Sequence, residues 1–185
     1  MLRYVLTFLP WIAFAVLSTN GEARIGAAAA LLVSVVLLAA DRRAGRGWDE
    51  LVIELSSGVF FAGLTLIAFT VSPAPFGEYG PAVSVAWLAL TAWGSLAIGK
   101  PFTLGIARRT TPAEVHATPL FQRVNAVITA VWAAGFTLNA AGLALLFALA
   151  PHATAAIIAV KVCGFALPAL FTIRYPQIVR ARYAA

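Results

Sequence analysis

Residues 120–149, LFQRVNAVITAVWAAGFTLNAAGLALLFAL, form one long apolar run whose single charge is Arg123. The hydrocarbon core of a bilayer is about 30 Å thick, and about 20 apolar residues in a helix are enough to cross it. This run is longer than one crossing needs, so we expect a membrane-spanning helix that tilts or projects into the headgroup layer.

The composition of the whole chain agrees with this run. Hydrophobic residues make up 62% of the 185 residues and charged residues 11%, against about 45–50% and about 25% in soluble proteins. So few charges cannot cover the surface of a water-soluble fold, and the mean hydropathy of +0.91 agrees. The composition predicts an integral membrane protein and excludes a disordered chain, a disulfide scaffold and a coiled coil.

Five more apolar stretches are comparable to this run, although the first is short and contains Pro10. We therefore predict an all-α bundle of six transmembrane helices. The loops between them leave no room for a soluble domain, so residues 1–185 are expected to form a single transmembrane domain. The expected spans are 4–19, 24–40, 51–70, 81–99, 120–149 and 153–173.

The basic residues indicate an orientation, because the loops of a six-span bundle alternate between the two sides of the membrane. Eleven of the 13 basic residues fall on one side, Arg24 falls on the other, and Lys161 lies within a span. The positive-inside rule then places both termini in the cytoplasm. The net charge of +6 is thus a topology signal that favours contact with anionic lipid headgroups, and nothing indicates nucleic-acid binding. The eleven residues are Arg3, Arg42, Arg43, Arg46, Lys100, Arg108, Arg109, Arg123, Arg174, Arg180 and Arg182.

The loop of residues 100–119 mixes apolar and basic side chains. Phe102, Leu104 and Ile106 are followed by two arginines, a pattern that suits a segment lying on the membrane surface. The run Thr111-Pro112-Ala113-Glu114 resembles a helix start. We expect a short interfacial helix here, with a re-entrant loop as the alternative.

Glu54 and Lys161 lie inside predicted spans, where ionisable groups are costly and are functional hypotheses by default. Glu54 sits about one turn inside its span, level with Arg123 and Asn125 of the 120–149 span. We expect these three residues to form a polar cluster on the cytoplasmic side, in which Arg123 pairs with Glu54 and Asn125 donates a hydrogen bond. The alternative is a purely structural clamp at the interface.

Lys161 lies deeper, about 12 Å from the start of its span at 1.5 Å per residue. Trp132 lies at the same depth and is expected to be buried. Three interpretations of Lys161 are open. It snorkels to the outer interface as a structural residue, lines a polar cavity that binds an anionic group, or is neutral through burial and moves protons.

The sequence contains no recognisable catalytic, metal or cofactor motif. Cys163 is the single cysteine, and the two histidines, His116 and His152, are 36 residues apart. No pattern of a nucleophile with its base, and no phosphate-binding loop, is present. We therefore predict that the protein is not an enzyme and binds neither a metal nor a cofactor.

Five short segments, spread over most of the chain, have the order and spacing found in one protein family. They are Phe8-Leu9-Pro10, Ala62-Gly63-Leu64-Thr65-Leu66, Gly99-Lys100-Pro101, Arg123-Val124-Asn125 with the later Trp132, and Val160-Lys161-Val162-Cys163-Gly164. In these segments the chain resembles a divergent member of the intracellular septation protein A family of bacterial inner-membrane proteins. The resemblance implies a role in septation and cell-envelope maintenance through contacts with division and elongation proteins, and draws attention to Lys100, Asn125 and Lys161.

Two functions therefore follow from the sequence. The favoured one is a non-enzymatic inner-membrane protein that acts through membrane partners. The alternative is a small transporter, or a protein that binds a lipid or anion, with Lys161 in an intramembrane cavity. Faces of small residues on the spans 51–70 and 120–149 predict close helix packing and leave a homodimer open.

Overall fold

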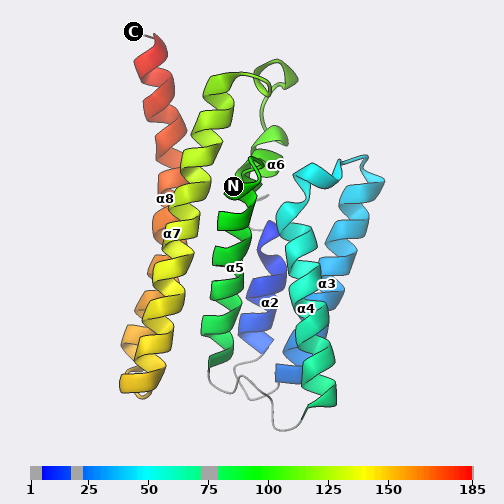
Figure 1. The fold of residues 1–185 in the computed structure, drawn as a ribbon, viewed down its shortest axis with the longest axis vertical. Coiled ribbons are helices and arrows are strands. Elements are labelled where there is room, and N and C mark those ends of the chain that lie inside the picture. Colours follow the sequence, from blue (N-terminus) through cyan, green and yellow to red (C-terminus); the bar gives the residue numbers. More distant parts are fainter. Residues whose placement is uncertain (1–5, 18–22, 72–78, 185) are drawn as a thin grey trace. The chain divides into compact units, whose positions relative to one another are not determined.

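The computed structural model describes residues 6–17, 23–71 and 79–184, and within these ranges it contains helices and no strand (Figure 1). The chain divides into two compact units, which we call unit 1 (Met1–Gly77) and unit 2 (Glu78–Ala185). The predicted single domain over residues 1–185 stays a prediction.

In the described part of unit 1, α3 (Ala23–Arg43) packs against both α2 (Leu9–Leu17) and α4 (Val52–Thr70). Aromatic side chains of α2 and α4 form the core of this unit. The rings of Trp11 and Phe61 lie 4.8 Å apart, and those of Phe14 and Phe61 lie 5.6 Å apart. The indole N–H of Trp11 also donates a hydrogen bond of 2.7 Å to the hydroxyl of Ser57. These contacts give the short α2 a fixed place against α4.

The helix α3 ends in a C-terminal cap formed at Gly45. Gly45 has a positive φ of 79°, a conformation that costs glycine little. Its N–H donates to the carbonyl of Arg42, and the N–H of Arg46 donates to that of Asp41. This pair of bonds is the Schellman arrangement. The one-turn 3-10 helix η1 (Trp48–Glu50) then leads into α4.

Unit 2 is organised around its longest apolar helix. α7 (Pro119–Leu149) packs against α5 (Gly80–Ala97) on one side and α8 (Thr154–Ala184) on the other (Figure 1). Thr118 caps the start of α7, because its hydroxyl accepts a hydrogen bond from the N–H of Phe121. A tight turn joins the antiparallel helices α7 and α8.

Among the described residues, five helices are long and apolar enough to cross a membrane, which indicates a multi-pass helical membrane protein. They are α3, α4, α5, α7 and α8, and each overlaps a predicted span. The first predicted span, 4–19, contains the nine-residue α2, and its two ends lie outside the described residues. The count of six spans and the cytoplasmic termini stay predictions.

The last helix is longer than expected. The predicted span ends at Ile173, before Pro176, whereas α8 continues through both Pro168 and Pro176 to Ala184. A proline removes one backbone hydrogen bond but does not have to end a helix whose freed groups find other partners. Thr172 lies between the two prolines, and its hydroxyl donates to the carbonyl of Pro168 four residues earlier.

The segment expected to lie on the membrane surface is partly buried. A helix forms earlier than predicted, as α6 (Phe102–Arg108), and residues Phe102–Ile106 are buried, with α6 packed mainly against α7. Burial is favoured over a surface position because Phe102, Leu104 and Ile106 are large and apolar, while the hydroxyl of Thr103 finds partners on α7. The predicted helix start near Thr111 produces only the exposed single turn η3 (Ala113–Val115).

Small residues allow α7 and α8 to approach closely. A Cβ atom added to Gly135 would lie 2.7 Å from the ring of Pro168, and one added to Gly164 would lie 2.0 Å from the amide nitrogen of Asn139. These positions confirm close packing for the small-residue face of α7. On α4, by contrast, a Cβ added to Gly58 or Gly63 would have nothing within 4 Å, so these two glycines make no close contact, whereas Ser57 of the same helix is fully buried.

Candidate functional site

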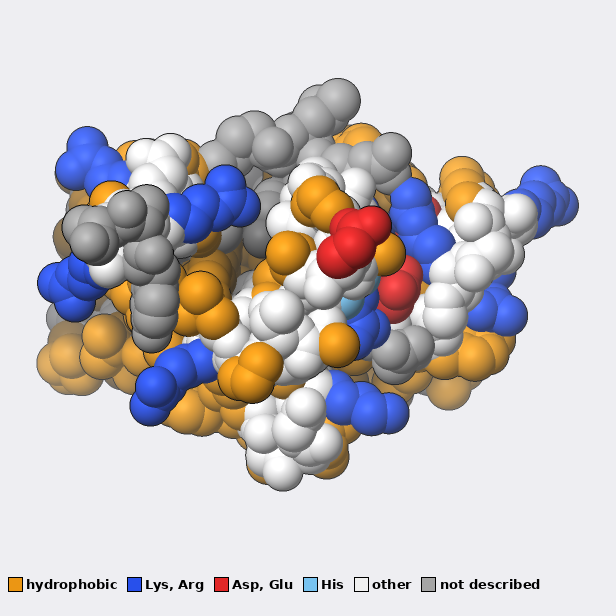
Figure 2. All heavy atoms as spheres, turned by 90° about the horizontal axis from the view of Figure 1, so that it is seen from above, with side chains coloured by type: hydrophobic (Ala, Val, Ile, Leu, Met, Phe, Trp, Pro, Cys, Tyr) orange, Lys and Arg blue, Asp and Glu red, His pale blue; other side chains and the backbone are white. Residues whose placement is uncertain are grey.

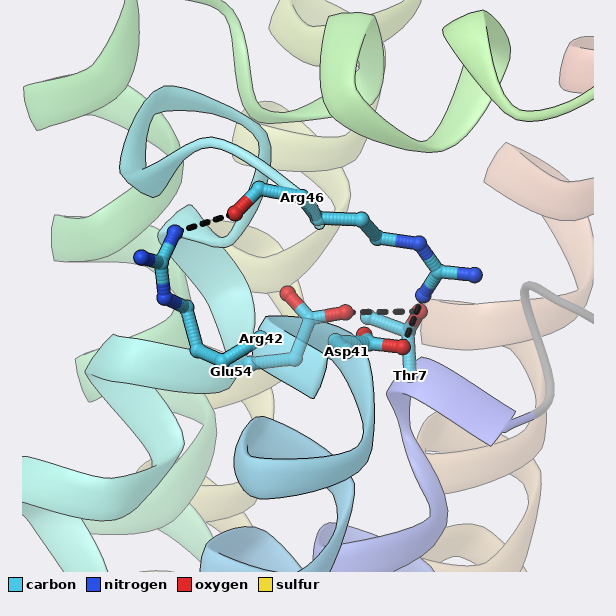
Figure 3. Close-up of polar contacts among 5 residues, drawn as sticks. All are labelled: Thr7, Asp41, Arg42, Arg46 and Glu54. Carbon is cyan, nitrogen blue, oxygen red and sulfur yellow. Dashed lines mark hydrogen bonds and ion pairs between the residues drawn. The ribbon is translucent and has the colours of Figure 1, made fainter. Parts of the chain in front are cut away.

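A buried carboxylate lies at one end of unit 1. Glu54 is in the first turn of α4, and only 5% of its side chain is exposed. Its Oε1 accepts a long hydrogen bond, 3.5 Å, from the buried hydroxyl of Thr7, and Figure 3 shows the two side chains turned toward each other. A carboxylate is costly to bury without partners. The contact with Thr7 therefore stabilises the packing of the start of α4 against the segment that precedes α2.

The turn between α3 and α4 carries a second set of polar contacts (Figure 3). Arg46 forms an ion pair with Asp41, and an Nη of Arg42 donates to the carbonyl of Arg46. The guanidinium of Arg42 also lies 4.2 Å above the ring centre of Trp48, a cation–π contact. Three charged side chains are therefore used to hold one turn in shape.

Glu54 provides a direct stability test of this end of unit 1. Glu54→Ala is expected to lower the free energy of unfolding by about 1–3 kcal/mol, because it opens a small cavity and removes the acceptor of the Thr7 hydroxyl. Glu54→Gln keeps an acceptor oxygen and the side-chain volume, so it is expected to cost less than half as much. Thermal unfolding of the purified protein in detergent measures both variants. Equal losses for the two would show that the contact with Thr7 contributes nothing.

In unit 2, Asn125 belongs to a buried polar group that joins α6 to α7. The hydroxyl of Thr103 lies 2.9 Å from the carbonyl oxygen of Asn125 and 2.8 Å from the hydroxyl of Thr129. The side-chain amide of Asn125 donates back to the carbonyl of Phe121. Thr103 and Thr129 were not identified as candidates from the sequence. Each is an isolated hydroxyl in an apolar segment, and this feature could have indicated a buried hydrogen bond.

Two basic candidates, Lys100 and Arg123, lie at the same end of unit 2 as Asn125. Lys100 is exposed and follows Gly99, whose positive φ of 69° ends α5 in a second Schellman arrangement. Arg123 is exposed and lines a groove between α7 and α8, together with Tyr175 and Arg182. This groove was not expected from the sequence, because its two walls are about 50 residues apart in the chain.

The predicted cluster of Glu54, Arg123 and Asn125 draws on both units. Glu54 lies in unit 1, and the other two residues lie in unit 2. Within its own unit, Glu54 contacts Thr7 and Asn125 contacts α6. The joint cluster therefore stays a prediction.

Lys161 lies on an exposed part of α8. It is seven residues from the start of the helix, which corresponds to about 10 Å. The groove between α7 and α8 is at the opposite end of these helices, and Lys161 does not line it. An exposed position in unit 2 is compatible with a side chain that snorkels toward the outer interface. The cavity interpretation and the proton-transfer interpretation stay predictions.

Trp132 is buried as expected, with 4% of its surface exposed. Its indole N–H donates a hydrogen bond of 2.9 Å to the hydroxyl of Thr172. Its ring packs against Phe136 of the same helix and Phe165 of α8, at centroid distances of 5.3 and 6.3 Å. Trp132 thus joins α7 to α8 through both a hydrogen bond and a ring contact.

Metal binding has no support within residues 6–17, 23–71 and 79–184, where no three His, Cys, Asp or Glu side chains are grouped closely enough to hold an ion. Comparison with known protein families, with curated proteins and with solved structures gives no match for this chain.

Proposed function

We propose that this chain is a non-enzymatic, multi-pass protein of the bacterial inner membrane that maintains the cell envelope by binding other membrane proteins. The single observation that carries the proposal is the exposure of α8. In the most apolar 18-residue stretch of α8 only 6% is buried, whereas 33% of the corresponding stretch of α7 is buried. Large apolar side chains cover its outer face, among them Val162, Leu167 and Leu170, each more than half exposed. A bilayer or a helix of another membrane protein can cover such a face.

Buried polar side chains that hydrogen-bond between helices also support a role in binding. Trp11 contacts Ser57, Thr103 contacts Thr129, and Trp132 contacts Thr172. Each of these contacts joins two helices within one unit. Polar groups used in this way stabilise a scaffold, whereas a catalytic site needs them free to meet a substrate.

The proposed orientation has both termini in the cytoplasm. Lys100, Arg123 and Arg182 all lie at the end of unit 2 where α7 begins and α8 ends. The other end of the α7–α8 pair, the turn at residues 150–153, contains no Lys or Arg. By the positive-inside rule this difference favours a cytoplasmic basic end. The resemblance to septation proteins supports the same membrane and the same role.

Deletion of the gene tests the proposed role. Deleted cells are expected to show altered shape or division and raised sensitivity to osmotic and detergent stress, and wild-type protein should restore normal growth. Leu167→Ala and Leu170→Ala together should impair this restoration while leaving the amount of protein in the membrane unchanged. Normal growth of deleted cells under both stresses would contradict the proposal.

A control variant separates partner binding from simple lipid exposure. Leu90 on α5 is 67% exposed, so Leu90→Ala makes a similar change on another exposed helix face. Leu90→Ala is expected to restore growth fully. Full restoration by the α8 double variant as well would mean that lipid alone covers α8, and the binding role would fail.

A further inference from the structure

A groove of about 440 Å³ lies between the first two turns of α7 and the last turns of α8. Leu120, Arg123 and Val124 line one wall, at the i, i+3, i+4 spacing of one helix face. Tyr175 and Arg182 lie on the other wall, which Val179 completes. The groove therefore combines two guanidinium groups, one phenol and an apolar surface.

The charges in this groove are not balanced within unit 2. Unit 1 carries five basic and five acidic residues, whereas unit 2 carries eight basic residues and two acidic ones, Glu78 and Glu114. The ion pair between Arg46 and Asp41 belongs to unit 1, and the residues that line the groove include no acidic one. Figure 2 looks onto the end where α8 terminates, and Lys and Arg side chains project there. Arg123 and Arg182 thus favour an anion from outside the unit.

The distance of the groove from the opposite end of α7 and α8 corresponds to the depth of a lipid headgroup layer. The hydrocarbon core is about 30 Å thick, and the whole bilayer is about 40–45 Å thick. At 1.5 Å per residue, Arg123 lies about 39 Å from the opposite end of α7 at Leu149, and Tyr175 and Arg182 lie about 32 and 42 Å from the start of α8. With the turn at residues 150–153 in the headgroup layer on one side, Arg123 and Arg182 fall in the headgroup layer on the other side, and Tyr175 lies near the edge of the core.

We propose that the groove of Leu120, Arg123, Val124, Tyr175, Val179 and Arg182 binds an anionic glycerophospholipid. The two guanidinium groups hold the phosphate through charge-assisted hydrogen bonds, a geometry that arginine provides better than lysine. The phenol of Tyr175 supplies a third donor, and its ring is held by stacking on Phe171 at 4.8 Å. The apolar walls contact the glycerol and the first acyl carbons. This site does not depend on the proposed role in the envelope.

Native mass spectrometry of the full chain, released from detergent with defined lipids, tests the proposal. The wild-type protein is expected to bind phosphatidylglycerol at least tenfold more tightly than phosphatidylcholine. Arg123→Gln and Arg182→Gln should each weaken phosphatidylglycerol binding about tenfold, because each removes one charged donor pair. Arg180→Gln makes the same charge change on α8 outside the groove and should alter binding less than twofold. An equal loss in all three variants would show general attraction to a basic end and overturn the site.

A variant that keeps every charge tests the groove itself. Val179→Trp fills the space between the walls and should also weaken phosphatidylglycerol binding about tenfold, while circular dichroism confirms an unchanged helix content. Undiminished binding by Val179→Trp would overturn the proposal. Inorganic phosphate, added as a competitor, should not displace the lipid at millimolar concentration, because it lacks the apolar part. Displacement would assign the groove to a soluble phosphate compound and overturn the lipid as its occupant.

Discussion

Trp132→Ala is expected to lower the free energy of unfolding of unit 2 by about 3–5 kcal/mol, the range for removing a large buried aromatic side chain. The indole fills the space between α7 and α8, contacts Phe136 and Phe165, and donates to Thr172. Alanine removes all of these contacts. Thermal unfolding in detergent, followed by circular dichroism, should show a clearly lowered midpoint.

Two comparisons show which part of Trp132 matters. Trp132→Phe keeps most of the packing and loses the hydrogen bond, so it is expected to cost about 1 kcal/mol. Trp93→Ala is the matched control, because Trp93 also donates to a threonine, Thr137, but is 47% exposed. It should cost at least 2 kcal/mol less than Trp132→Ala, since less packing is lost. Similar losses for both tryptophans would contradict the buried position of Trp132.

Gly164→Ala is the second substitution with a large expected effect. Its Cβ would lie within 3 Å of three Asn139 atoms, one of which is the Cβ and cannot move away without the backbone. Added volume in a tightly packed contact costs about 1–3 kcal/mol. We therefore expect Gly164→Ala to separate α7 from α8 and to lower the unfolding midpoint.

Gly94→Ala is the control for this substitution. Gly94 lies within α5 in the same unit, and a Cβ there would have nothing within 4 Å. Alanine is a better helix former than glycine by about 1 kcal/mol, so Gly94→Ala should be neutral or stabilising. A loss of stability in Gly94→Ala equal to that in Gly164→Ala would mean that close α7–α8 packing is not the cause.

The long helices could be predicted from the sequence because hydropathy is a local property. The expected spans 24–40, 51–70 and 81–99 differ from α3, α4 and α5 by at most three residues at either end. The burial of Trp132 also followed from its position inside an apolar run. Its partner Thr172 did not, because the two residues are 40 positions apart and meet only when α7 and α8 pack.

The two departures from the expected fold have the same kind of cause. The sequence around Phe102 alternates apolar and polar residues well enough to suit a membrane surface, but Thr103 finds partners on α7 and the whole turn becomes buried. Pro176 is a stop signal in local terms, yet α8 passes it. In both cases tertiary contacts outweigh the local signal.

The predicted cluster of Glu54, Arg123 and Asn125 stays a prediction. Asn125 and Glu54 are each buried within their own unit, and each has a hydrogen-bond partner there. The partners of these residues depend on packing across many residues and could not be assigned from one sequence. The groove at Arg123 has a similar origin, since Arg182 reaches it only because α8 is longer than its apolar span.

Cysteine accessibility in intact cells tests most directly whether α7 and α8 cross the membrane with their basic end in the cytoplasm. The single native cysteine is first removed as Cys163→Ser, and His152→Cys or Ala181→Cys is then introduced. A membrane-impermeant maleimide should label His152→Cys in intact cells, but label Ala181→Cys only after the inner membrane is opened. Labelling of Ala181→Cys in intact cells, or of both positions, would contradict this topology.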